Sequence, residues 1–245
     1  MDLLTLAGLV IAFTSVFLAN WLGGGEIVLL LNLPSAIIVI IGSIGAALIQ
    51  STLINALRSL AMFKWTLFPP RYHLSKARHA VFLLAVKARK SSLVDLDSDV
   101  SNLKSELATR ALQMAVDGVD AAELLDRMHG EVVRLREKRE TAIEFMESIG
   151  GYAPTLGIMG SVLGLIQAMA NLNSPEALGH GIAVAFVSTL YGQGFANLVV
   201  FPLAKKVSFY ADQELLYHQL LIDGIHGIAV GKHPQRLDIE LSGYE

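Results

Sequence analysis

The chain has 245 residues and a formal net charge of −3, and 53% of its residues are hydrophobic, which gives a mean hydropathy of +0.52. This composition is too apolar for a soluble globular protein and indicates a membrane protein. The absence of cysteine excludes disulfides and thiolate metal sites, and the slightly acidic balance gives no indication of nucleic-acid binding.

Four uncharged stretches are each long enough to cross a hydrocarbon core about 30 Å thick. They cover residues 3–25, 27–57, 148–175 and 177–204. Fifteen of the nineteen Lys and Arg residues lie between Arg58 and Arg139, and the other four lie from Lys205 onward. By the positive-inside rule, the amino terminus, the central segment and the tail are predicted to be cytoplasmic. The predicted fold class is an all-α membrane protein with four transmembrane helices, a helical cytoplasmic insert between helices two and three, and a helical cytoplasmic C-terminal extension.

Residues 1–57 are predicted to form a transmembrane hairpin. The first stretch begins with Asp2 instead of a basic segment, which favours a retained span over a signal peptide. Pro34 is expected near the start of the second helix, where a missing N–H costs little. Bulky side chains of this hairpin are predicted to face lipid: Leu29, Leu30, Leu31, Ile37, Ile38, Val39, Ile40 and Ile41.

Residues 58–147 are predicted to form a compact helical bundle after Pro69 and Pro70 end the preceding helix. Apolar residues at helical spacing predict three helix faces. These faces comprise Ala80, Leu83, Leu84 and Lys87; then Leu103, Leu107, Ala111 and Met114; then Leu124, Met128, Val132 and Leu135. Gly118 is a predicted helix stop. The last helix of the insert is expected to run straight into the third span, and the 205–245 tail is expected to begin as a helical continuation of the fourth span.

The third and fourth spans, residues 148–204, carry small residues three or four positions apart on one face each. The two stripes contain Ala153, Gly157, Gly160 or Ser161, Gly164 and Ala168, and Ala185, Ser188 or Thr189, Gly192 and Ala196. Taken alone, such stripes are typical of close helix packing with no transport role.

Two prolines and several polar side chains favour a further role for these spans. Pro154 and Pro202 each interrupt a helical hydrogen-bond ladder, and irregular backbone at membrane depth needs protein or water around it. The same two spans hold hydroxyl and amide side chains, namely Thr155, Ser161, Ser188, Thr189, Gln167, Gln193 and Asn197. None of the four span cores contains an acidic or basic residue, although ion pathways usually need one. Either the chain conducts nothing, or another subunit supplies a carboxylate.

The segments YAPTLGIMGSVLGLIQAM and IAVAFVSTLYGQGFANLVVFPLAKK, with four spans and an insert between the second and third, resemble the A-type subunit of the bacterial flagellar stator, the MotA and PomA family. The likeness covers nearly the whole chain and is nearest to the MotC-like branch. It implies a ring of five subunits around two copies of a B-type partner (MotB, PomB or MotD-like) in the bacterial inner membrane. The partner's membrane aspartate would carry the ion, and the insert would pass torque to the rotor protein FliG.

The resemblance also implies roles for single residues. Pro154 matches the span-three proline beside the partner's aspartate, and Pro202 matches the span-four proline of the ion-coupled conformational change. Thr155, Gly157, Ser161 and Thr189 join them as predicted ion-pathway residues. Arg89 matches the family's rotor-facing arginine, and Asp97 stands where its rotor-facing acid is expected, although both could be ordinary surface charges.

The transported ion is expected to be H+, with Na+ as the alternative. Ser161 stands where sodium-driven members tend to have threonine and several proton-driven ones alanine, and Thr189 supplies the second hydroxyl of the sodium-type arrangement. Ser92 and the tail sequence KHPQR depart from the commoner family pattern.

Two other functions are open: an energiser of the ExbB or TolQ kind, which resembles a three-span arrangement, and a stand-alone channel. An enzyme is not predicted, because the seven histidines lack metal-ligand spacing and no nucleophile motif or phosphate loop occurs. No cofactor or metal is expected.

Overall fold

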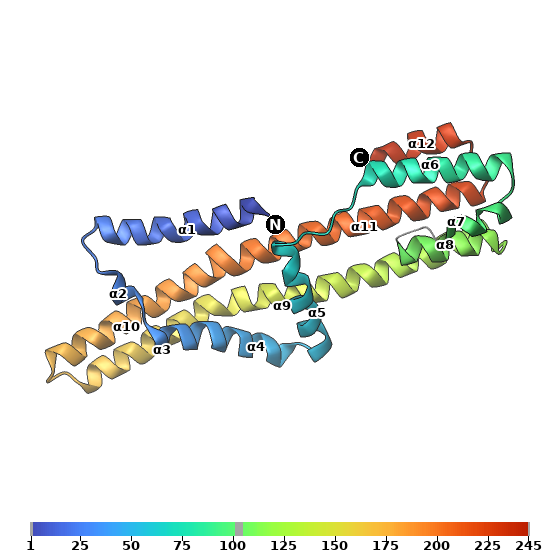
Figure 1. The fold of residues 1–245 in the computed structure, drawn as a ribbon. Coiled ribbons are helices and arrows are strands. Elements are labelled where there is room, and N and C mark those ends of the chain that lie inside the picture. The colour runs from blue at the N-terminus through green and yellow to red at the C-terminus, as the bar shows by residue number, and fades with distance from the viewer. Residues whose placement is uncertain (1, 101–104, 245) are drawn as a thin grey trace. The chain divides into compact units, whose positions relative to one another are not determined.

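The computed structural model describes residues 2–100 and 105–244, and within these residues it contains helices and no strand (Figure 1). Leu103, which was predicted to lie on a helix face, is outside the described residues. Four helical stretches have the length and hydropathy to cross a membrane. The predicted fold class is confirmed.

The chain divides into two compact units, which are described separately. Unit 1 comprises Met1–Pro69 and Glu140–Ser208, and unit 2 comprises Pro70–Arg139 and Phe209–Glu245. Two long helices contribute residues to both units: α9 (Ala121–Ala170) and α11 (Phe201–Ala229). The insert's last helix therefore continues into the third span as predicted, and the fourth span continues into the tail.

Unit 1 holds the four candidate membrane spans. Besides its parts of α9 and α11, its elements are α1 (Leu3–Leu22), α2 (Ile27–Leu30), α3 (Leu33–Ala36), the π-helical turn η1 (Ile37–Ile41), α4 (Gly42–Gln50), α5 (Leu53–Phe63), the 3-10 turn η2 (Lys64–Thr66), α10 (Pro175–Gly194) and the π-helical turn η4 (Phe195–Val200). Asp2 caps α1 by accepting hydrogen bonds from the N–H groups of Leu4 and Thr5, and it also forms an ion pair with Lys206 of α11. This ion pair ties the start of the chain to the fourth span.

The second span is interrupted, which the sequence analysis did not predict. Leu31 and Asn32 have extended backbone between α2 and α3. The Asn32 side chain caps α3 by accepting a hydrogen bond from the N–H of Ser35 at 3.0 Å. Pro34 lies in the first turn of α3, where its missing N–H leaves no helical bond unmade. Pro34 therefore starts a helix, but that helix begins after the break.

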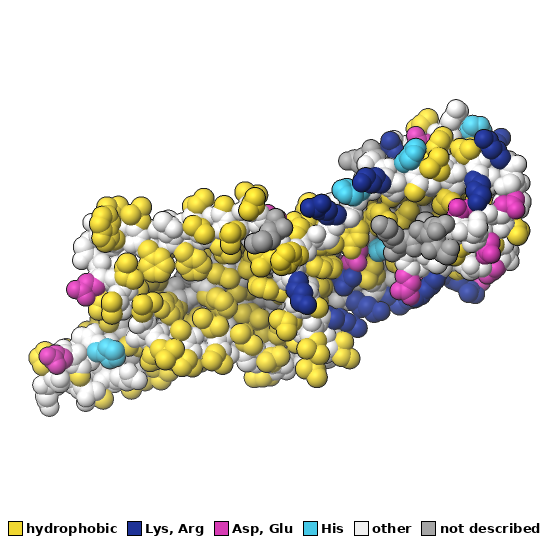
Figure 2. Space-filling model, in the orientation of Figure 1, with side chains coloured by type: hydrophobic (Ala, Val, Ile, Leu, Met, Phe, Trp, Pro, Cys, Tyr) yellow, Lys and Arg dark blue, Asp and Glu magenta, His cyan; other side chains and the backbone are white. Residues whose placement is uncertain are grey.

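Most of the bulky side chains predicted to face lipid are exposed in the chain, as Leu29 and Ile41 are, with 61% and 63% of their surface accessible. Figure 2 shows hydrophobic side chains over the visible face of unit 1. Val39 is an exception, and its prediction was wrong: it is fully buried and packs with Ala153 of α9 and Ala196 of η4. The small size of these two alanines leaves the space that Val39 fills.

Unit 2 is a helical bundle with its own apolar core. Its elements, besides parts of α9 and α11, are α6 (Leu74–Lys90), the 3-10 turn η3 (Val94–Leu96), α7 (Asp97–Val100), α8 (Glu106–Val116), α12 (Pro234–Leu241) and the 3-10 turn η5 (Ser242–Tyr244). The predicted face of α9 is confirmed, because Leu124, Met128 and Val132 are buried and Leu135 packs against them. Gly118 has a φ of +77°, which suits glycine in the turn between α8 and α9.

The predicted face of α6 was right for Leu84, which packs against the core, and wrong for Leu83. The buried residues are Ala77, Val81 and Ala85, whereas Leu83 is 54% exposed. The reason lies on α11, where Gly224 has no side chain: a Cβ there would lie 2.5 Å from a methyl group of Val81. Val81 therefore occupies the space that Gly224 leaves, and this contact sets the rotation of α6.

Candidate functional site

The glycine-rich stretches of α9 and α10 bring two backbones into contact. A Cβ on Gly164 would lie 2.7 Å from the backbone nitrogen of Ala185 and 2.8 Å from the carbonyl oxygen of Gly181. A Cβ on Gly157 would lie 2.8 Å from the carbonyl oxygen of Ser188. These distances are too short for a side chain, so the two predicted stripes pack against each other.

Ser161 and Thr189 meet inside this helix pair. The two hydroxyl oxygens lie within hydrogen-bond distance, and Ser161 Oγ also contacts the carbonyl oxygen of Ala185. Ser161 Oγ lies 3.1 Å from the carbonyl oxygen of Gly157, so both helices supply acceptors. Both side chains are half-buried. In this arrangement the hydroxyls satisfy one another and the local carbonyls, as serine and threonine commonly do in membrane helices.

Pro154 lies within α9 without ending the helix. It is half-buried and packs beside Gly192 of α10, where a Cβ on Gly192 would lie 3.2 Å from the Cα of Pro154. The next residue, Thr155, is exposed and donates a hydrogen bond to the carbonyl oxygen of Tyr152 at 2.8 Å. The proline is therefore held by glycine packing, while the neighbouring hydroxyl lies on the outside of the chain.

Pro202 lies at the start of α11, directly after the π-helical turn η4, and its side chain is exposed. A proline ring clashes with the carbonyl four residues earlier in a regular helix, and the wider π turn relieves that clash. Gln193 and Asn197 lie one turn apart just before it, and both are exposed. The Asn197 amide donates to the backbone oxygen of Gln193 at 3.0 Å and to its side-chain oxygen at 3.1 Å.

Arg89 and Asp97 belong to unit 2, whereas the predicted ion-pathway residues belong to unit 1. Arg89 is in the last turn of α6, Asp97 begins α7, and both side chains are exposed. An ion pair of 2.6 Å between Lys87 Nζ and Asp99 Oδ2 joins the two ends of this connection. The structure thus presents Arg89 and Asp97 among several exposed charged groups on one short, ion-paired segment.

Comparisons with known proteins agree with this arrangement. A family described as the MotA/TolQ/ExbB proton channel family matches residues 99–219. Motility protein A of Aquifex aeolicus is 34% identical over 237 residues, which cover 96% of this chain and 92% of that protein. The chain belongs to the MotA/TolQ/ExbB proton channel family. Within this family it is also similar to the chemotaxis protein PomA of Vibrio alginolyticus, with 30% identity over 100% of this chain and 95% of that one.

The fold of this MotA/TolQ/ExbB family member is also found in a solved structure, that of C. jejuni MotAB. The matched chain is 27% identical with a TM-score of 0.95, and the match covers 100% of this chain and 96% of that one. The family resemblance drawn from the sequence is confirmed.

A polar network at the break in the second span was missed by the sequence analysis. The Tyr191 phenol donates to the carbonyl oxygen of Leu30 at 2.6 Å, and its oxygen lies 3.3 Å from the backbone nitrogen of Asn32. The buried Ser35 and Ser188 hydroxyls lie 2.7 Å apart and join the two spans. The run Asn32, Leu33, Pro34 and Ser35 is a helix-start pattern that could have indicated the break.

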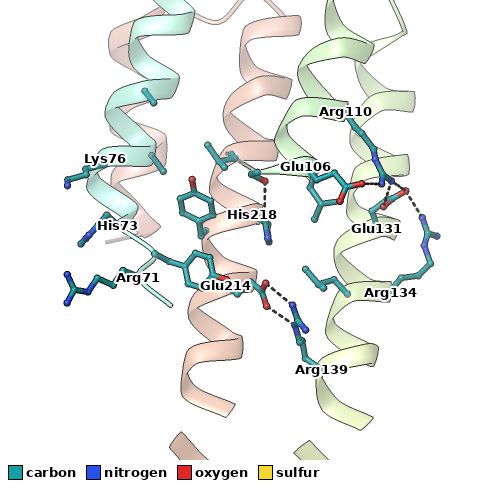
Figure 3. A pocket seen from close by; sticks show the side chains of 18 of the residues that line it. Arg71, His73, Lys76, Glu106, Arg110, Glu131, Arg134, Arg139, Glu214 and His218 are labelled. Carbon is teal, nitrogen blue, oxygen red and sulfur yellow. Dashed lines mark hydrogen bonds and ion pairs between the residues drawn. The ribbon is translucent and has the colours of Figure 1, made fainter. Parts of the chain in front are cut away.

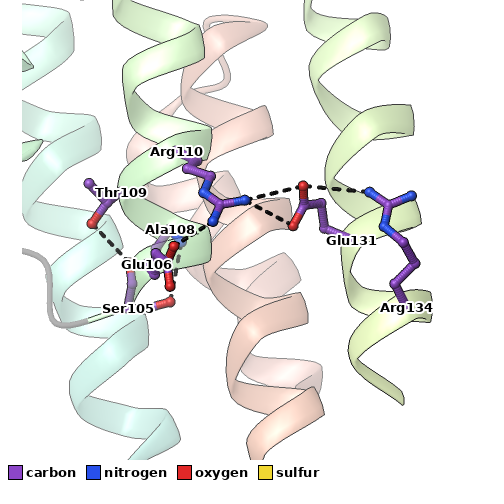
Figure 4. A network of polar contacts seen from close by, with 7 residues as sticks. All are labelled: Ser105, Glu106, Ala108, Thr109, Arg110, Glu131 and Arg134. Carbon is purple, nitrogen blue, oxygen red and sulfur yellow. Dashed lines mark hydrogen bonds and ion pairs between the residues drawn. The ribbon is translucent and has the colours of Figure 1, made fainter. Parts of the chain in front are cut away.

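A polar cleft of about 820 Å³ in unit 2 was also missed (Figure 3). Arg139 of α9 and Glu214 of α11 form a two-bonded ion pair beside it, with distances of 2.7 Å and 2.9 Å. On the α8 side, Arg110 contacts Glu106 and lies 3.2 Å from Glu131, as Figure 4 shows. No spacing pattern in the sequence indicates that Arg139 pairs with a residue of another helix.

Proposed function

We propose that this protein is the A-type subunit of a flagellar motor stator, which together with a B-type partner converts ion flow into torque on the rotor. The observation that carries the proposal is the full-length likeness to the MotAB chain, combined with four stretches that are long enough to cross a membrane and contain no acidic residue, lysine or arginine. A partner carboxylate would supply the ion carrier that the spans lack.

The ion path is assigned to the third and fourth spans. Pro154 and Thr155 would lie beside the partner's carboxylate, and Gly157 would keep α9 and α10 close together. Ser161 and Thr189 supply hydroxyl oxygens, and Pro202 follows the π turn that gives the fourth span an alternative backbone geometry. The proposed ion is H+, because the family is a proton channel family.

Neutralisation of the partner's carboxylate by the transported ion would drive a change between two packing states of this subunit. An ionised carboxylate in the bilayer is costly and favours contact with hydroxyl and backbone dipoles, whereas its protonated form loses that preference. A structure with two packing states can then be biased by one charge. The membrane potential provides about 2.3 kcal/mol per elementary charge per 100 mV, which is enough to bias states that differ by a few kcal/mol.

The torque surface is assigned to the connection between α6 and α7. Arg89 and Asp97 are exposed there and carry opposite charges, which suits steering onto a complementary surface of FliG. The Lys87 and Asp99 ion pair supports this proposal because it limits the freedom of the segment that carries both groups.

The proposed assembly is a ring of five copies around two copies of the B-type partner, in the bacterial inner membrane. The amino terminus, unit 2 and the tail would be cytoplasmic, which the distribution of Lys and Arg supports. An energiser of the ExbB or TolQ kind remains the second candidate, since the matched family includes both. The stator is favoured because relatives similar along the whole chain are motility proteins.

The test makes this chain and its neighbouring B-type subunit the only stator in an otherwise motile cell, and records the rotation of tethered cells. Rotation that persists without sodium and stops with a proton uncoupler is the expected result. Rotation that requires sodium would make Ser161 and Thr189 cation ligands and overturn the choice of ion. No rotation despite a complex assembled in the membrane would favour the energiser.

A further inference from the structure

Three chain crossings connect unit 1 to unit 2. They lie between Pro69 and Pro70, between Arg139 and Glu140, and between Ser208 and Phe209. Any movement that passes along the chain from unit 1 to the α6–α7 connection must go through these crossings. The residues of unit 2 next to them are therefore candidates for mechanical coupling.

Three side chains from the three crossing segments form one cluster in unit 2. Arg139 is the last α9 residue of this unit, Tyr72 comes two residues after Pro70, and Glu214 comes five after Phe209. Figure 3 shows the Arg139 and Glu214 side chains directed toward each other from their two helices. We name Tyr72, Arg139 and Glu214 the crossing cluster.

Geometry makes the ion pair of this cluster specific. Arg139 Nε lies 2.7 Å from Glu214 Oε2, and its Nη2 lies 2.9 Å from Oε1, so the planar guanidinium and the carboxylate meet along two parallel bonds. Glu214 is the only charged residue that is buried among those that the structure describes, with 7% of its surface accessible. A two-bonded pair fixes the rotation and the axial register of α9 against α11 more tightly than a single contact would.

Tyr72 joins the third crossing segment to this pair. Burial raises the pKa of the Tyr72 phenol, and the charge of Glu214 and a hydrogen bond to its carboxylate raise it further. The Tyr72 ring also lies 5.4 Å from the ring of Tyr217, measured between centroids, which anchors it against α11. The phenol therefore stays protonated, and its place in the cluster rests on the ring contact with Tyr217, one turn after Glu214 on α11.

Stability alone is a poor reason for such a cluster. Removing two charges from water is costly, and replacing a buried ion pair by apolar side chains is often neutral or stabilising. The best-attested role of buried polar groups is to fix the register between two packed elements. The position of this cluster, at all three chain crossings, gives that register a mechanical use.

We infer that Tyr72, Arg139 and Glu214 position the three crossing segments as one joint, so that force from unit 1 reaches the α6–α7 connection without slippage between α9 and α11. The inference rests on the proposed stator function. The three residues are positioning residues, because the proposed roles in the ion path and at the rotor belong to other side chains.

The experiment measures rotation of single motors driven by this chain and its B-type partner. Four variants are compared with the unchanged chain: Glu214→Gln, the charge exchange of Arg139→Glu with Glu214→Arg, Tyr72→Phe, and Asp238→Asn as the matched control. Asp238 forms a 3.3 Å ion pair with Arg78 between α12 and α6, inside unit 2, and it does not join α9 to α11. Speed per stator is recorded at high and at low viscous load, together with the amount of complex in the membrane.

Glu214→Gln is expected to lose speed per stator at high load and to keep its low-load speed and its amount of complex, while Asp238→Asn matches the unchanged chain. The charge exchange is expected to recover part of the high-load loss. A purely structural pair would slow rotation equally at both loads, and this result would overturn the inference. Equal high-load speeds for Glu214→Gln and the unchanged chain would also overturn it.

Tyr72→Phe decides the matter if Glu214→Gln does not accumulate, because it keeps the ring and the ion pair. A selective high-load loss in Tyr72→Phe supports the joint, and an unchanged high-load speed rejects it. Failure of the unchanged chain to drive rotation would instead reject the proposed function, so the two failures are distinguishable.

Discussion

Replacing Gly192 by alanine tests whether the helix pair depends on backbone contact. A Cβ at this position would lie 2.7 Å from the carbonyl oxygen of Ala153 and 3.0 Å from the Cα of Gly157. Ordinary contact begins at 3.4 Å, so α9 and α10 would have to separate by about 0.7 Å, the difference between 3.4 and 2.7. Both neighbours are backbone atoms, so no side-chain rotation can relieve the overlap. Overpacking of this kind costs about 1–3 kcal/mol.

Gly194→Ala is the matched control, since a Cβ there meets nothing within 4 Å in the chain. Both glycines belong to α10, so alanine's better helix propensity, about 1 kcal/mol, enters both variants and cancels in the comparison. Thermal unfolding of the purified complex should therefore give Gly192→Ala the lower melting temperature. Equal melting temperatures would refute the view that these glycines are needed for close approach.

Three further predictions concern single side chains. Pro154→Leu should abolish torque in tethered cells with a normal amount of complex in the membrane, because it removes the proline that is proposed to lie beside the partner's carboxylate. Loss of the complex would count against this mechanism. Tyr191→Phe should destabilise the complex by about 1–3 kcal/mol in thermal unfolding, because it leaves the Leu30 carbonyl at the break in the second span without its donor. Burial lowers the pKa of His218 in unit 2, so its contribution to stability is present above the unfolded-state pKa of about 6.5 and is lost as pH falls below it. His218→Gln should accordingly reduce the loss of melting temperature on acidification, and an unchanged pH profile would contradict this.

The spans could be predicted because their signal is local. An uncharged stretch of twenty or more residues is rarely anything but a membrane-spanning helix. The continuation of the insert's last helix into the third span followed from helical spacing that is not interrupted between them. The break at Leu31 and Asn32 was missed because hydropathy is insensitive to backbone conformation. Val39 was misassigned for another reason: its burial depends on Ala153 and Ala196, which are more than a hundred positions away in the sequence.

The candidate site likewise contains residues that the local sequence identifies and residues that only their distant partners identify. Its glycines, prolines and hydroxyls could be selected because each has an unusual property for a membrane helix, whatever its neighbours are. Glu214 has no such property, since an acid in a charged helical segment is ordinary. Its significance comes from Arg139, which is 75 positions away, and no spacing rule connects the two.

The exposed amides of the fourth span show which face of unit 1 needs a protein partner. Gln193 and Asn197 satisfy part of their hydrogen-bonding capacity with each other, yet both side chains lie on the surface of an uncharged span. If these side chains faced lipid, their unpaired polar atoms would raise the free energy of the protein in the membrane. A leucine at the same positions would carry no such penalty. Pro202 comes directly after the π-helical turn η4 and is also exposed, and irregular backbone in a span needs protein or water around it. We therefore expect the B-type partner to cover this face, and its carboxylate to reach the membrane interior beside groups that can donate hydrogen bonds to it.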